Sequence, residues 1–165
     1  LARFVENWPR EFPLAIEVRH EDYFDSAACE TELDHLLRHA GVDRVLFDSR
    51  CLFSQRPSDE SELAAQQRKP QSPFRRTVTA QRPFLRLIGR NHLEQTVPWL
   101  KEWALQVSQW IHEGLRPSVF IHTPDDKYAP DMARHFHVEL QRHLPDIPDL
   151  PLFPVDSSPQ QKFLF

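Results

Sequence analysis

Glycine is scarce in this sequence, with three residues among 165. Neither a P-loop nor a GxGxxG motif is present, and there is no nucleophile elbow. Long apolar runs are also missing, so no segment predicts a membrane-spanning helix, and none resembles a signal peptide. These absences predict a cytoplasmic protein without a glycine-rich nucleotide-binding loop.

Cysteine and methionine are nearly absent as well. Cys29 and Cys51 fit a reducing compartment, and since neither belongs to a CxxC pair we expect free thiols without a special role. The single methionine is Met132, and the chain opens at Leu1 within an amphipathic pattern. We therefore expect the sequence to be a piece of a longer protein.

Neither sign of charge dominates. The formal net charge is -4 and the pI is near 6.1, so a site for a polyanion would have to be a local patch. With 40% hydrophobic and 27% charged residues, the composition is that of an ordinary folded protein. The chain is long enough to form one sizeable core.

Strand-like and helix-like patterns alternate along the chain. Four short apolar runs predict strands, at residues 13–18, 43–48, 84–89 and 118–123. Helical patterns follow the runs, and the first helix is expected between Ser26 as N-cap and Gly41 as C-terminal stop. A short helix is expected at 59–69, a longer one from Thr96 to just before Gly114, and a last one at 130–144. This alternation predicts an α/β protein with a parallel sheet, with a long loop over one end of the sheet at 50–82.

Side-chain alternation within each predicted strand gives one apolar face and one face with a polar residue near the carboxyl end. These four residues are Glu17, Asp48, Arg86 and His122. The pattern favours the C-terminal half of a TIM-type (β/α)8 barrel at 1–144, followed by a proline-rich tail at 145–165. Four parallel strands with outer helices leave two open edges, so this half should require a partner.

Arg86 is the least expected residue of these strands, because an unpaired buried guanidinium costs several kcal/mol. Glu17 and Asp48 are the nearest expected partners. The four polar residues form either a structural ion-pair network or a ligand site, and the second interpretation is favoured by donors at the strand ends that suit an anion. These donors are Arg19, His20, Arg90 and Asn91.

The first functional hypothesis is an enzyme with a phosphate or other anion at the barrel mouth. Arg19, Arg86 and Arg90 would hold the anion, and Glu17 or Asp48 would act as base. The reaction would be phosphoester hydrolysis, linked to nucleic-acid metabolism. A divalent metal held by Glu17, Asp48 and His122 is less favoured, because Arg86 would compete for the carboxylates.

Two further segments bear on function. The basic segment at 68–82 is either a solvated surface or, folded over the mouth, an extension of the anion site towards nucleic acid. The last five residues, with Gln161, Leu164 and Phe165, resemble peptides that dock in a bacterial sliding clamp, which predicts a non-catalytic interaction protein as the alternative. The tail packing across the protein's own helices is the other interpretation.

Several separate segments together resemble one known family. They are AIEVRH at 15–20, VLFDSR at 45–50, FLRLIGRN at 84–91, FIHTPDD at 120–126, the residues 65–69 and the tail PQQKFLF. In this order and spacing the sequence is similar to the domain-of-unknown-function-72 family, the YecE-like proteins. The resemblance implies a TIM-type barrel, but it supplies no reaction. The family's motif positions in this chain are Glu17, Arg19, His20, Asp48, Arg86 and Arg90.

Overall fold

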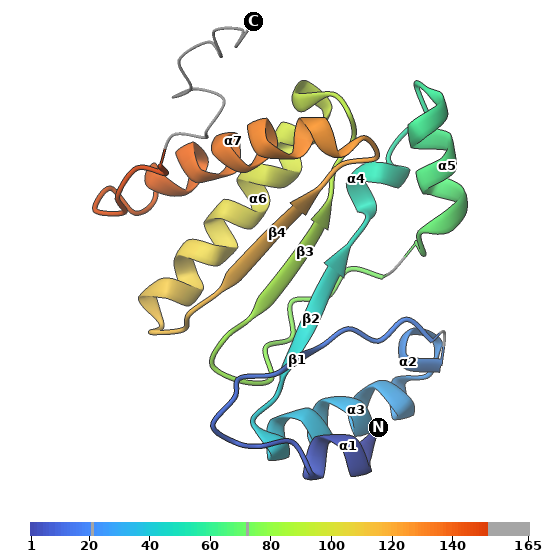
Figure 1. The fold of residues 1–165 in the computed structure, drawn as a ribbon, viewed down its shortest axis with the longest axis vertical. Coiled ribbons are helices and arrows are strands. Elements are labelled where there is room, and N and C mark those ends of the chain that lie inside the picture. The colour runs from blue at the N-terminus through green and yellow to red at the C-terminus, as the bar shows by residue number, and fades with distance from the viewer. Residues whose placement is uncertain (21, 72, 152–165) are drawn as a thin grey trace, which may run out of the picture.

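The computed structural model describes residues 1–20, 22–71 and 73–151. Its centre is a parallel sheet whose strands β1 to β4 follow one another in space in the order of the sequence (Figure 1). The strands are β1 Ala15–Ile16, β2 Asp43–Asp48, β3 Phe84–Ile88 and β4 Ser118–His122. The α/β class with four parallel strands is confirmed, and each strand lies within the range expected from the sequence.

Helices surround and connect the strands. They are α1 Ala2–Glu6, α2 Asp22–Asp25, α3 Ala27–Ala40, α4 Arg50–Phe53, α5 Glu60–Arg68, α6 Leu93–His112 and α7 Ala129–Gln141, with a 3-10 turn at Asp126–Tyr128. As predicted, Ser26 caps α3 by accepting a hydrogen bond from the Cys29 N–H, and Gly41 ends it with a φ of 65°.

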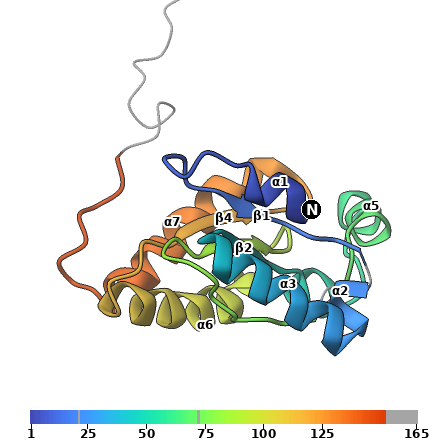
Figure 2. The same ribbon diagram turned by 90° about the horizontal axis from the view of Figure 1, so that it is seen from below.

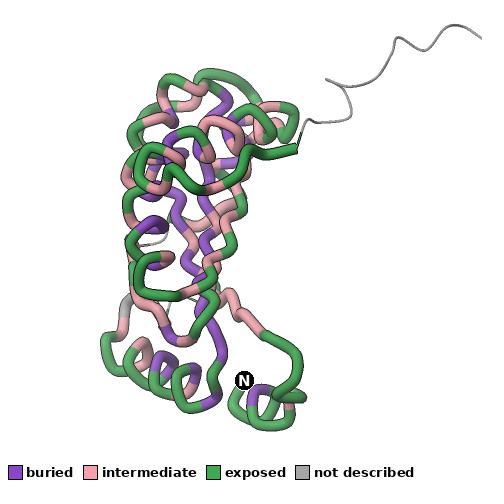
Figure 3. The backbone as a smooth tube through the Cα atoms, turned by 90° about the vertical axis from the view of Figure 1, so that its left-hand side faces the viewer, coloured by how far each residue is buried: buried purple, intermediate pink, exposed green. Residues whose placement is uncertain are grey.

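One face of the sheet is covered by α3 and α6, which Figure 2 shows along the same side of the strands. Leu85 and Leu87 of β3 are fully buried there, against Leu100, Trp103 and Val107 of α6. Helix α7 adds Phe136 and Leu140 to this core. In Figure 3 the buried backbone accordingly runs through the middle of the molecule.

The long connection between β2 and β3 covers the carboxyl end of the sheet and part of its helical face. Its first part, α4 and α5, covers the carboxyl end of the strands, where Leu52 and Ala65 pack against Ile88. Its second part runs back along the helical side, where Phe74 and Val78 join the core. The predicted short helix of this connection is confirmed as α5.

The segment after α7 returns to that helix. Residues 145–151 form neither helix nor strand, yet His137 Nε2 lies 2.9 Å from the Pro148 carbonyl oxygen. Gln141 Nε2 donates to the Ile147 carbonyl oxygen at 3.1 Å. The start of the proline-rich segment therefore packs on the protein's own helix. Across the described ranges, no helix has both the length and the apolar character to cross a membrane.

Candidate anion-binding site

The face of the sheet opposite α3 and α6 is hollowed. Strand register places Phe47 beside Arg86, and Arg86 beside Phe120, while Phe84 and Phe120 stack with ring centroids 4.7 Å apart. A hollow of about 500 Å³ lies over these aromatic rings. It shares Arg86 and His122 with a smaller hollow of about 320 Å³ near the strand carboxyl ends.

We call the smaller hollow the cationic pocket. Its titratable lining residues are Arg19, Arg68, Lys69, Arg86, His122 and Asp126. They come from β3, β4, the last turn of α5 and the segments that follow β1, α5 and β4. Four cations therefore surround a space in which Asp126 is the only lining carboxylate among the described residues.

Glu17, which lines the larger hollow, forms ion pairs with two of these cations. Arg19 Nε donates to Glu17 Oε1 at 2.6 Å, and Arg86 Nη1 donates to Glu17 Oε2 at 3.0 Å. Both guanidinium carbons lie within 6 Å of the centre of the Phe47 ring, at 5.9 and 5.7 Å. One carboxylate and one aromatic ring thus hold two guanidiniums at the pocket edge, as a cation–π arrangement does.

Lys69 lies where α5 ends and is half-buried. Among the described residues its ammonium forms no ion pair, and Arg68 donates only to the Ala64 carbonyl oxygen. Burial, followed by repulsion from Arg86 and Arg19, lowers the pKa of Lys69. The pocket therefore holds positive charge that its own carboxylates do not balance.

His122 and Asp126 face each other across the turn that follows β4. His122 Nδ1 lies 2.7 Å from Asp126 Oδ1, in the geometry of an imidazole held by a carboxylate. The His122 side chain is 33% exposed, so its ring edge reaches the pocket. A carboxylate on one ring nitrogen leaves the other to exchange protons with a ligand.

Arg90 and Asn91 lie outside this pocket, contrary to the grouping expected from the sequence. Arg90 is 1% exposed, and its Nε and Nη2 both donate to the buried carboxylate of Glu62. The Asn91 side chain donates to Asp59 Oδ2 at 2.8 Å. These bonds fasten α5 to the end of β3. The two residues thereby position the helix that carries Lys69.

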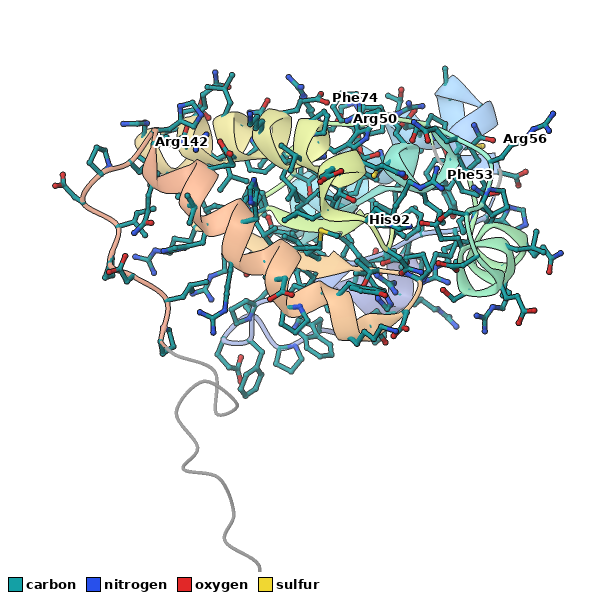
Figure 4. The ribbon with its side chains drawn as sticks, turned by 90° about the horizontal axis from the view of Figure 1, so that it is seen from above. Arg50, Phe53, Arg56, Phe74, His92 and Arg142 are labelled. Atoms are coloured by element: carbon teal, nitrogen blue, oxygen red, sulfur yellow. The ribbon has the colours of Figure 1, made fainter. Side chains whose placement is uncertain are left out.

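Asp48 is also separated from the other strand carboxylate. It shares the helical face of the sheet with Leu46, where Trp103 Nε1 donates to its Oδ2 at 2.7 Å. Arg50 adds bonds from Nε and Nη2, and its guanidinium lies 3.5 Å from the centre of the Phe74 ring (Figure 4). The expectation that Asp48 joins Glu17 and Arg86 is therefore wrong, because alternation along β2 directs it to the opposite face.

His20 and the basic segment at 68–82 are also distributed between the cationic pocket and other parts of the surface. His20 lines a different hollow beside α3, with its Nδ1 3.4 Å from Asp22 Oδ2. The basic segment splits, since Arg75 pairs with Glu30 and Arg76 with Glu102 on the helical side. Arg68 and Lys69, at the start of the segment, line the cationic pocket. Asp126 had no such sequence signal, because only the turn brings it to His122.

The structure also bears on the predictions about a metal ion and about the two cysteines. Across the described residues, no group of three or more His, Cys, Asp and Glu side chains could hold a metal ion. Both cysteines are free, and burial raises the pKa of Cys51 to about 11. Gln161, Leu164 and Phe165 lie outside the residues that the structure describes, so the clamp-docking alternative stays a prediction.

Fold and pocket together define an α/β protein with a parallel sheet and a cationic pocket at the strand carboxyl ends. The chain belongs to the family described as protein of unknown function DUF72, which matches residues 1–154. The resemblance seen in the sequence segments is therefore confirmed.

Curated relatives in this family include UPF0759 protein YecE of Escherichia coli K12, 35% identical over 158 residues. The O157:H7 protein of the same description is 34% identical. Each alignment covers 96% of this chain, which spans 58% of either relative.

Solved structures show the same fold at lower identity. Two crystal structures of a DUF72 family protein from Enterococcus faecalis V583 match with TM-scores of 0.55 and 0.57. Their sequence identities are 14% and 16%, over 89% and 87% of this chain and 52% and 53% of theirs. At this identity the likeness concerns the fold alone.

Proposed function

We propose that the cationic pocket binds a phosphate-bearing small molecule. The observation that carries this proposal is the excess of cations, with Lys69 half-buried and without an ion-pair partner in the described chain. A phosphate would supply the missing negative charge, and guanidiniums match its oxygens in bidentate geometry. A small ligand is favoured over a nucleic-acid strand, because Arg75 and Arg76 are paired on the other side of the sheet.

The setting that we propose for this pocket is the C-terminal half of a TIM-type barrel over residues 1–144. Support comes from the sequential strand order and from the two helices on one face. In such barrels ligands bind at the carboxyl ends of the strands, which is where the cationic pocket lies. On this proposal the hollowed face would be the lumen.

Phosphoester hydrolysis, the enzymatic version of this proposal, would need a general base at the pocket. Glu17 is bonded by two guanidiniums, and Asp48 faces the helices. His122, paired with Asp126, is the candidate that remains within reach. Binding is therefore the better supported part of the proposal.

Phosphate titration followed by NMR or calorimetry tests the binding directly. We expect Arg19→Met and Arg86→Met each to weaken inorganic phosphate binding roughly tenfold, as loss of one charged hydrogen bond predicts. In either variant Glu17 keeps one guanidinium partner, so the fold should persist. Added salt should reduce the difference in phosphate affinity between the wild-type protein and these variants, because it screens the charges.

Arg116→Met is the matched control, because Arg116 is exposed beyond the opposite end of the sheet and lines none of the hollows described above. It should leave phosphate affinity unchanged. Equal affinity in the wild-type protein and in both pocket variants would refute the anion site.

A further inference from the structure

Lys69 adds to the excess of cations in the cationic pocket, but its chemistry differs from that of the guanidiniums beside it. Among the described residues it is the only amine that lines the cationic pocket, it is half-buried, and its ammonium has no carboxylate partner. The guanidiniums that line the pocket with it stay charged at any physiological pH. Phosphate could be held by these guanidiniums without Lys69.

Burial and nearby positive charge change the protonation of the Lys69 amine. Burial and the neighbouring Arg86, Arg19 and Arg68 make the ammonium form costly and lower the pKa of Lys69, while Asp126 opposes the shift. An uncharged lysine amine is a nucleophile, and proximity to other cations is one established way to activate it. The chain's two other described lysines lack such surroundings, since Lys101 is exposed on α6 and Lys127 pairs with Asp125.

We propose that Lys69 forms an imine with the carbonyl carbon of a phosphorylated aldehyde or ketone whose phosphate is held by Arg19 and Arg86. The inference rests on the proposed anion site, because that site supplies the grip on the phosphate. It goes beyond that site by assigning the carbonyl class of ligand and a covalent role to one residue.

The step balances without a further reactant. The lone pair of Lys69 Nζ forms a bond to the carbonyl carbon, and the carbonyl π electrons move to oxygen. A proton passes from nitrogen to that oxygen, and a second proton from His122, whose Nδ1 is held by Asp126, lets it leave as water. The product is a protonated imine. Addition of water reverses the step.

Pyridoxal 5′-phosphate is a suitable probe, because it carries both an aldehyde and a phosphate. The protein is incubated with the probe, reduced with borohydride and digested, and the modified lysines are located by mass spectrometry. We expect Lys69 to be modified at least several-fold faster than Lys101 at about pH 8, because the guanidiniums of Arg19 and Arg86 hold the probe's phosphate beside it and because its lowered pKa leaves more free amine. Lys69→Arg, which keeps the charge, should abolish the adduct at this position, and Lys101→Arg should not affect it.

Two comparisons separate this inference from the anion site. Inorganic phosphate should slow modification of Lys69 but not of Lys101, and pyridoxal without its phosphate should react more slowly at Lys69. Equal modification of Lys69 and Lys101 would overturn the imine inference even if phosphate binding persisted. Fast modification of Lys69 that phosphate does not slow would instead refute the anion site and leave a reactive lysine.

Discussion

Glu62→Gln is expected to lower the free energy of unfolding by about 3–5 kcal/mol, the usual cost of breaking a buried ion pair. Glu62 is completely buried and accepts bonds from Arg90 and from the Asn91 backbone N–H. With an amide in its place, the guanidinium of Arg90 would remain buried without a counter-charge. Chemical denaturation measures the loss.

The same change should weaken phosphate binding, because the Glu62–Arg90 pair holds the helix that ends at Lys69. Glu60→Gln, on the exposed side of that helix, is the control and should have little effect on either property. The double variant Glu62→Leu with Arg90→Met should recover much of the stability, since an apolar pair leaves no unpaired charge. A loss below about 1 kcal/mol in Glu62→Gln would contradict this account.

At acid pH, Glu62→Gln should cost less stability than at neutral pH. Burial acts to raise the pKa of Glu62, but the hydrogen bonds from Arg90, Ser58 and Asn91 prevail and hold it below its ordinary value. The stabilisation is therefore complete above that ordinary value of about 4.3 and is lost as pH falls through the lower folded-state pKa. The stability gap between the wild-type protein and Glu62→Gln should accordingly narrow in that range.

Asp48→Ala is expected to cost about 3 kcal/mol of stability and to leave phosphate affinity unchanged. Its loss would leave the buried Trp103 N–H without an acceptor and deprive Arg50 of its bidentate partner. Arg50 would keep Glu102, which limits the cost. Thermal or chemical denaturation and phosphate titration of the same variant measure the two effects.

Asp48→Asn is the informative companion, because its amide oxygen can still accept the Trp103 N–H. It should recover part of the lost stability. If Asp48→Ala abolished phosphate binding while stability stayed near that of the wild-type protein, Asp48 would belong to the ligand site after all.

Local patterns were sufficient to predict the four strands and the longer helices, but not the short helices α1, α2 and α4. Runs of apolar, β-prone residues located all four strands, and Ser26 and Gly41 marked the ends of α3. The alternation of strands and helices indicated parallel pairing, because such connections return each strand in the same direction. For α6 the prediction began at Thr96, three residues after the observed start at Leu93, since helix ends are the least specific part of the pattern.

The candidate site was predictable only in part. Glu17, Arg19, Arg86 and His122 do line the hollowed face, whereas Asp48, His20, Arg90 and Asn91 lie elsewhere. On β2 both faces carry apolar residues, with Val45 and Phe47 on one and Leu46 on the other. Alternation therefore could not tell which face of that strand the helices cover. Only the pairing register with β3 decides it.

By itself the sequence determined the strands, the helix caps and the parallel α/β class, because these depend on neighbouring residues in the chain. Tertiary structure alone decided that Lys69 lies beside Arg19 and Arg86. That placement requires α5 to be fastened to the end of β3 by Glu62 and Arg90, which are 28 residues apart. A contact between residues so far apart in the sequence depends on how the elements pack, and no local pattern encodes it.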